Sequence, residues 1–346
     1  MKKYKFMFIL MSLFLFSGCG VKNNSNDVLE KFEKKVNSVK SYNIKGTMEI
    51  TSNEETYTYD VNVDYLFEDK YKVTLTNKVN GHEQVILKND EGVYVVTPAL
   101  NKSFKFQSDW PNNSSQSYLL SSLVRDIKNT KDIKIDTNDD YIIANVNVNY
   151  PNNPNLASEK IYFDKNNNLK EVQVLNKDGN AIIRMKFGEI NYSKKMDVNN
   201  FSLDTLITQN DCKGEENCTS LEKTEESINI LDNIVYPLYV PQDTHLSTKD
   251  TVSTDNGDRV IMTYAGAKPF MIIEEAVTVN KDMEITSVYG DPLLLSTAIG
   301  ALSSNSLEWQ SNNVQYYITS SYLTGEELMS IAESLNTAAV VDITNK

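Results

Sequence analysis

The chain has 346 residues with a formal net charge of −13, and 40% of its residues are hydrophobic. This hydrophobic share excludes wholesale disorder, and the length allows roughly two domains with cores of their own. So acidic a chain is repelled by phosphate, and we therefore expect no nucleic-acid partner. Nineteen tyrosines among Val- and Thr-rich runs favour strands over helices.

The N-terminal segment, MKKYKFMFILMSLFLFSGCG, has the pattern of a secretory signal. Three lysines precede an apolar run over residues 6–16 that is too short to span a bilayer, and a Ser-Gly pair leads to Cys19. This ending resembles a bacterial lipobox, in which the signal is cut before the cysteine and the sulfur receives a diacylglyceryl group. Phe16 stands where that pattern usually has leucine. We expect a signal peptide at residues 1–18 and lipidation at Cys19, with an ordinary signal or an N-terminal anchor as the alternative.

Lipidation at Cys19 predicts where the protein resides. Two acyl chains hold a protein stably on a membrane, so the lipid is expected to be the membrane contact. No later apolar run of the sequence approaches the ~18 residues of a spanning helix. We therefore expect a body tethered to the extracytoplasmic face of the cell membrane, joined to its lipid by residues 19–26.

Two further cysteines, Cys212 and Cys218, lie in an acidic stretch, residues 206–235, that lacks strand alternation and is expected to be a linker. In an exported protein such closely spaced cysteines can close a small disulfide loop worth roughly 2 kcal/mol. No histidine lies nearby in the sequence, so a metal site is a poor competitor. We expect a local disulfide without a catalytic redox role.

Residues 27–205 are expected to form one domain. Apolar residues at positions 28, 29, 32, 36 and 39 share one face of a helix over residues 27–40. The period then changes to two, and turn signals such as Asn80-Gly81 and Asp178-Gly179 separate the alternating runs. Roughly ten one-faced strands with few helices predict an α+β fold: a large curved antiparallel sheet, or half-barrel, covered by helices.

Residues 236–346 are expected to form a small C-terminal α+β domain. Strands are predicted at residues 260–264 and 270–275, followed by a tight hairpin that starts at residue 306. Thr324 begins a final helix and Glu327 completes its capping box. The inner face of this helix is formed by Leu328, Ile331 and Leu335.

The stretch that begins at residue 92, GVYVVTPALNKSFKFQSDWPNNSSQSYLL, follows the amphipathic helix and the long one-faced strands. Together these features resemble the LolA/LolB/RseB half-barrel superfamily, and within it the sporulation and germination lipoproteins of the YdcC and GerS type. The resemblance covers about residues 27–205. It implies a concave side that holds apolar groups beneath helices. In LolA these groups are lipoprotein acyl chains, and in the GerS type the partner is a cell-wall amidase.

Catalytic chemistry is not expected. The two histidines, His82 and His245, are far apart and lie in no known catalytic or metal-binding pattern. No phosphate-binding glycine loop occurs in the sequence, so we expect no enzyme activity, no cofactor and no metal. An aromatic cluster of Phe104, Phe106 and Trp110 can line an apolar ligand cavity; the alternative is that it fills the core.

Two functions from different classes remain. In the first, the chain is an anchored, non-enzymatic scaffold that binds an exported protein in sporulation or germination, such as a cell-wall amidase. In the second, the half-barrel is a carrier or sensor for acyl lipid. Beside these two, an RseB-like regulator of a transmembrane anti-sigma factor is a further alternative. A filled core favours the scaffold, whereas an open apolar cavity of several hundred Å³ favours the carrier.

Overall fold

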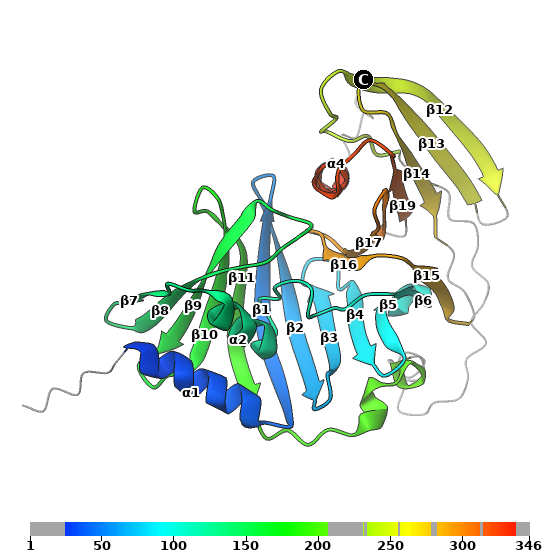
Figure 1. Cartoon of the computed structure of the whole chain (residues 1–346). Helices are drawn as coiled ribbons and strands as arrows, with labels where there is room; N and C mark the ends of the chain where they lie inside the picture. Colours follow the sequence, from blue (N-terminus) through cyan, green and yellow to red (C-terminus); the bar gives the residue numbers. More distant parts are fainter. Residues whose placement is uncertain are drawn as a thin grey trace, which may run out of the picture.

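The computed structural model of the chain describes residues 25–206, 231, 234–254, 257–277, 282–311 and 314–336. The expected signal, Cys19, Cys212, Cys218 and nearly all of the expected linker lie outside these residues. The described chain forms two large sheets, the first with two helices packed against it and the second with one (Figure 1). Among these residues, no helix is long and apolar enough to cross a membrane.

The first sheet has twelve strands in the order β15-β6-β5-β4-β3-β2-β1-β11-β10-β9-β8-β7. Neighbours pair antiparallel except for β15 and β6, which run parallel. The sheet is strongly curved (Figure 1). Its strands are β1 (Ser41–Ser52), β2 (Glu55–Leu66), β3 (Lys70–Asn77), β4 (Glu83–Asn89), β5 (Gly92–Thr97), β6 (Lys102–Phe106), β7 (Lys134–Thr137), β8 (Tyr141–Asn147), β9 (Leu156–Asp164), β10 (Leu169–Asn176), β11 (Ala181–Asn191) and β15 (Glu284–Val288).

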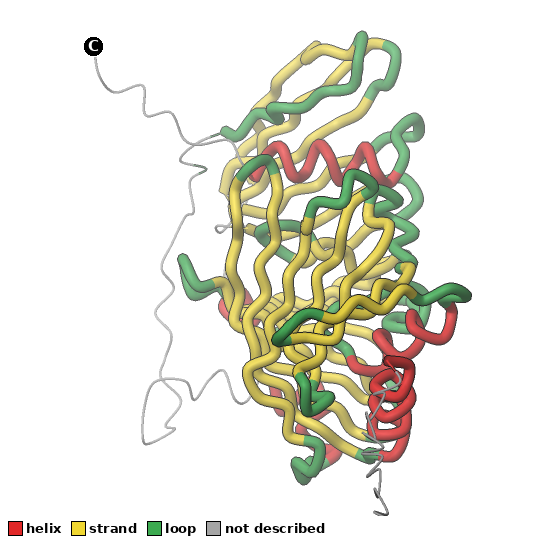
Figure 2. Tube along the Cα trace, turned by 90° about the vertical axis from the view of Figure 1, so that its left-hand side faces the viewer, coloured by secondary structure: helices red, strands yellow, loops and turns green. Residues whose placement is uncertain are grey.

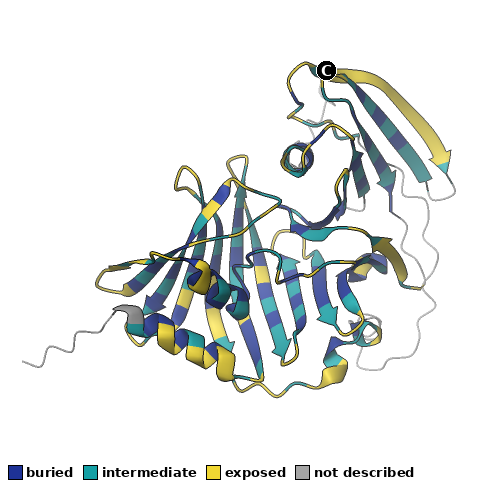
Figure 3. Cartoon of the chain, viewed as in Figure 1, coloured by how far each residue is buried: buried dark blue, intermediate teal, exposed yellow. Residues whose placement is uncertain are grey.

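Alternation of apolar and polar residues decides which face of this sheet is buried. Val61 and Val63 on β2 face Leu75 and Val73 on β3, and all four side chains are almost fully buried. The polar residues between them lie on the opposite face, so buried and half-buried positions alternate along this part of β2 and β3 (Figure 3). The half-barrel predicted from this period is confirmed.

Two helices, α1 (Ser25–Ser38) and α2 (Leu120–Asn129), cover the buried face of the first sheet. In the side view they lie on one side of the strands (Figure 2). Phe32 of α1 packs against Phe163 of β9 with 5.3 Å between ring centroids, and Lys128 of α2 forms an ion pair with Glu33 of α1. The helix expected at residues 27–40 is confirmed, with its bounds shifted by two residues. Short 3-10 turns, η1 (Pro98–Leu100) and η2 (Val198–Phe201), complete this part of the chain.

The second sheet has seven strands in the order β12-β13-β14-β19-β18-β17-β16. The helix α4 (Gly325–Asn336) packs on one face of it, and its buried Leu328 and Ile331 join that core. The predicted capping box is confirmed, since Thr324 N–H donates to Glu327 Oε2 over 3.1 Å and Glu327 N–H donates to Thr324 Oγ1 over 3.2 Å. The strands are β12 (Thr244–Thr254), β13 (Gly257–Gly266), β14 (Phe270–Ala276), β16 (Asp291–Leu294), β17 (Ile299–Leu302), β18 (Ser306–Ser311) and β19 (Val314–Thr319).

The C-terminal part of the chain contributes to both sheets. Strand β15 extends the edge of the first sheet, and Ile299 and Ala301 are buried in the core of the half-barrel. Gln84 Oε1 on β4 accepts a hydrogen bond from Ile299 N–H over 2.6 Å. The α+β class of both parts is therefore as expected, whereas the domain boundary at residue 236 stays a prediction.

Candidate functional site

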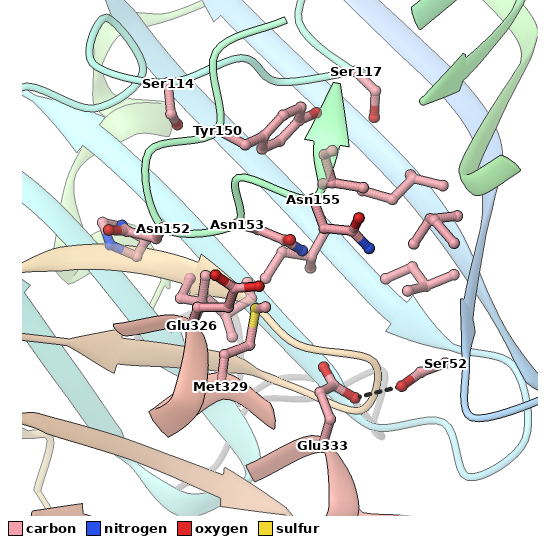
Figure 4. Close-up of a pocket in the computed structure, with 18 of the residues that line it drawn as sticks. Ser52, Ser114, Ser117, Tyr150, Asn152, Asn153, Asn155, Glu326, Met329 and Glu333 are labelled. Carbon is pink, nitrogen blue, oxygen red and sulfur yellow. Dashed lines mark hydrogen bonds between the residues drawn. The ribbon is translucent and has the colours of Figure 1, made fainter. Parts of the chain in front are cut away.

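A cavity of about 520 Å³ lies where the open end of the half-barrel meets α4 (Figure 4). This volume falls in the range of roughly 300–1,000 Å³ that is usual for ligand pockets. Four segments supply most of its walls: the ends of strands in the first sheet, the loop between β6 and α2, the loop between β8 and β9, and α4 with the strands before it. The cavity is therefore built by residues that are far apart in the sequence.

The floor of the cavity is apolar because strands of the half-barrel end there with their buried faces turned inward. Ile50 on β1 lies directly opposite Ile183 on β11 in the sheet register. Ile86 of β4 and Leu156, the first residue of β9, extend this floor. Burial of such side chains beneath a ligand supplies non-directional affinity of about 25 cal/mol per Å².

The β8–β9 loop forms a polar wall. Its backbone is fixed by hydrogen bonds from Asn153 N–H to Tyr150 O and from Leu156 N–H to Asn153 O, both 3.0 Å long. Asn152, Asn153 and Asn155 all line the cavity, and Figure 4 shows their carboxamides between the strands of the floor and α4. Each carboxamide can donate two hydrogen bonds and accept others.

The opposite wall is one face of α4, where Glu326, Met329 and Glu333 line the cavity. Glu333 accepts hydrogen bonds from Ser52 Oγ over 3.0 Å and from Ser296 N–H over 2.8 Å. Because Ser52 ends β1, this carboxylate joins α4 directly to the rim of the half-barrel (Figure 4). Burial raises the pKa of Glu333, and its bonds from Ser296 and Ser52 act in the opposite direction.

Behind the β8–β9 loop lies a pair of buried acids. Glu159 on β9 is fully buried, and neither of its carboxylate oxygens has a hydrogen-bond partner among the described residues. Burial raises its pKa well above the usual value, and the charge of Asp126 on α2 raises it further. Burial also raises the pKa of Asp126 to about 6, whereas Ser115 and Arg125 lower it. Tyr150, which lines the cavity, lies within the electrostatic reach of both acids.

Of the three aromatic residues expected to line a ligand cavity, the structure places only Trp110 at the cavity. Trp110 is 1% exposed, lines the cavity, and packs edge-on against Tyr71 with 6.0 Å between ring centroids. Phe104 and Phe106 lie in the core of the half-barrel, where their rings contact each other and do not line the cavity. The assignment of a ligand to Trp110 stays a prediction.

The sequence interpretation did not single out the β8–β9 asparagines or the glutamates of α4. The asparagine-rich run PNNPN was a signal for a loop, but nothing local shows that α4 lies opposite it. His82 directly precedes β4 of the first sheet and His245 lies on β12 of the second, so the two histidines are not brought together. In the described ranges, no group of three His, Cys, Asp or Glu residues is placed to hold a metal ion.

Comparison with known proteins places the chain in a family. The sequence model described as "Sporulation protein YdcC-like" matches residues 1–201. A curated relative, "Sporulation protein YdcC" of Bacillus subtilis (strain 168), is 33% identical over 341 residues, which cover 97% of this chain and 98% of the relative. The chain belongs to the YdcC-like sporulation proteins. Most of the cavity floor and the β8–β9 loop fall in the matched residues 1–201, whereas α4 lies beyond them.

Two solved structures also align with this YdcC-like protein. The crystal structure of MucB has a TM-score of 0.34 at 12% identity, and the alignment covers 89% of this chain and 97% of MucB. A chain in the structure of the CwlD amidase from Clostridioides difficile in complex with the GerS lipoprotein has a TM-score of 0.23 at 14% identity. That alignment covers 50% of this chain and 95% of the other.

Proposed function

We propose that this YdcC-like protein is a membrane-anchored, extracytoplasmic binding protein that acts in sporulation without catalysing a reaction. The observation that carries the proposal is the cavity, because its floor and its two walls form a recess large enough for a segment of a partner. The core beneath α1 and α2 is filled by buried side chains. The volume of the cavity by itself meets the criterion for a carrier, but its asparagine and glutamate walls are polar, and this lining together with the filled core favours a scaffold that receives a polar segment over a carrier that encloses an acyl chain.

The proposed partner is an exported cell-wall enzyme such as an amidase, and the proposed binding site is the cavity. To test both, the tagged protein is recovered in mild detergent from membranes of sporulating cells, and bound proteins and lipids are analysed together. Ser330 on α4 lines the cavity and is half-buried, so Ser330→Trp fills the recess from one wall. Ser193→Trp adds the same side chain at an exposed position elsewhere and is the matched control.

We expect the wild-type protein and Ser193→Trp to recover a cell-wall hydrolase in about equal amounts, and Ser330→Trp to lose it. Recovery of the hydrolase by all three proteins would mean that the partner binds another surface, and it would refute the proposed site. Recovery of acyl lipid without any protein partner would refute the scaffold. That result would support the second candidate, a lipid carrier or sensor, which the apolar floor of Ile50, Ile86 and Ile183 favours.

The proposed anchor is a lipid on Cys19. Cys19→Ser is expected to leave the signal uncut or to release the protein from the membrane, measured by fractionation of cells and by the mass of the N-terminal peptide. Cys212→Ser is the matched control, because we propose that Cys212 pairs with Cys218 and carries no lipid. Unchanged processing and membrane association of Cys19→Ser would contradict the lipid anchor.

A further inference from the structure

We propose that the cavity selects an extended peptide segment that combines apolar side chains with a positive charge, and that it rejects anionic amphiphiles. This inference rests on the proposed function, because it assigns the chemistry of the partner segment to the same site. It adds a charge preference and a mode of backbone recognition, which neither the family nor the sequence assigns.

The charge preference follows from the lining of the cavity. Glu326 and Glu333 both line it from α4, seven residues apart and therefore on the same face of the helix. Among the described residues that line it, none is lysine, arginine or histidine. A carboxylate or phosphate head group would therefore meet negative charge without a cationic partner, whereas an ammonium or guanidinium group would be attracted.

Of the two buried acids behind the β8–β9 loop, only Asp126 adds negative charge near neutral pH. Asp126 is 3% exposed and its Oδ2 has no hydrogen-bond partner among the described residues, as is also true of both oxygens of Glu159. Both acids lie close enough to Tyr150, a lining residue, to raise its pKa. Burial raises the pKa of Asp126 only to about 6, so above that pH its charge adds to the field in the cavity, partly offset by Arg125, whereas Glu159 keeps its proton.

The asparagines favour a peptide over a lipid chain. Asn152, Asn153 and Asn155 form no side-chain hydrogen bond with any described residue, although all three line the cavity. Free carboxamides match the alternating N–H and C=O groups of an extended backbone, because each amide offers both donors and an acceptor. An acyl chain would leave these polar groups without partners, at a cost of about 1–3 kcal/mol for each group that it dehydrates.

The apolar floor and Met329 explain why the segment needs apolar side chains. Ile50 and Ile183 are fixed in the sheet, so they form a rigid surface for a branched or aromatic side chain. Met329 lines the cavity from α4, and its unbranched thioether can adapt to different shapes (Figure 4). The cavity therefore fits an apolar side chain next to a basic one, with backbone amides held by the asparagines.

The test uses the full-length lipidated protein in nanodiscs of phosphatidylcholine, with binding followed by fluorescence anisotropy. Two fluorescein-labelled hexapeptides, Gly-Leu-Ile-Lys-Leu-Gly and Gly-Leu-Ile-Glu-Leu-Gly, differ only in the sign of one charge. We expect the lysine peptide to bind about tenfold more tightly than the glutamate peptide at low salt, and the difference to shrink as salt is added.

Three single-residue variants test which side chains cause the charge preference and the binding of the peptide backbone. Glu326→Gln is expected to weaken binding of the lysine peptide by about 2- to 5-fold, because it removes one exposed charge from the lining of the cavity. Glu189→Gln makes the same charge change at an exposed position of β11 and is expected to leave binding unchanged. Asn153→Ala is expected to weaken both peptides without altering the preference between them.

Laurate and dodecyltrimethylammonium serve as lipid-like competitors. Displacement of the lysine peptide by laurate at equal or lower concentration would overturn the peptide assignment, and equal binding of both peptides would overturn the charge preference. Either outcome can occur while Ser330→Trp still abolishes recovery of a partner from cells. Failure of this inference is thus separable from failure of the proposed function.

Discussion

The buried pair of Asp126 and Glu159 predicts a stability that falls as pH rises. Burial raises the pKa of Asp126 from 3.8 to about 6, so the folded protein holds a proton that the unfolded chain releases. Stabilisation by this group is complete below the unfolded value and is lost as pH rises through the folded value. A difference of about 2 units corresponds to about 3 kcal/mol.

Asp126→Asn removes this dependence while preserving the shape of the side chain. The carboxamide oxygen can still accept the hydrogen bond from Ser115 that opposes the shift in Asp126. We expect the variant to match the wild type near pH 4 and to exceed it by up to about 3 kcal/mol near pH 8. Glu159→Gln should shift stability in the same direction, because burial and Asp126 also raise the pKa of Glu159.

The assay is urea unfolding at a series of pH values, followed by tyrosine fluorescence and circular dichroism. Only the difference between variant and wild type is interpreted, because burial also raises the pKa of Glu274, to about 7, and that of Glu333. Asp132→Asn, at an exposed position just beyond α2, controls for the change in net charge. Parallel pH profiles for Asp126→Asn and the wild type would refute the reasoning.

Three further perturbations test the fold that positions the cavity. Thr324→Ala removes the side-chain cap of α4 and should lower the free energy of unfolding by about 1 kcal/mol, measured by urea titration; no loss would contradict the capping box. Gly46→Val should destabilise β1 by about 1–3 kcal/mol or more, because a Cβ at Gly46 would lie 2.2 Å from Lys186 O; a thermal midpoint equal to that of the wild type would disprove this crowding. In the parallel register, the N–H of Thr286 donates a hydrogen bond to β6, so Thr286→Pro should detach β15. The N–H of Ser287 points away from β6, so Ser287→Pro should be tolerated. Limited proteolysis near β15 compares these two variants, and equal cleavage would contradict the assigned ladder.

Much of the fold follows from local patterns in the sequence. Period-two alternation predicted the strands of the half-barrel, and the Asn80-Gly81 signal coincides with a turn in which Gly81 has φ +70° and donates to Asn77 O. The capping box at Thr324 was equally local. These features were predictable because each depends on residues within a few positions of one another.

Strand β12 shows where that reasoning fails. It is an edge strand whose residues 245–253 are all exposed, so neither face is buried and no apolar period marks it. Glu159 is the opposite case, since it shares the buried face of β9 with Ile161 and Phe163. The sequence therefore contains a signal for Glu159, namely an acid two residues from a core position of the same strand. Its pairing with Asp126 becomes visible once the position of α2 is known.

The cavity could not be predicted, because it depends on the return of the C-terminal chain to the half-barrel. Strand β15 pairs with β6, and Ile299 enters the first core before α4 forms the wall opposite the β8–β9 loop. Tyr59 on β2 also donates a hydrogen bond to Ser296 O over 2.6 Å, and Glu333 joins the same segment to Ser52. The half-barrel alone would thus lack both an edge strand and one wall of the recess. Any activity that depends on the recess requires the two parts together, in keeping with a relative that aligns along nearly the whole chain.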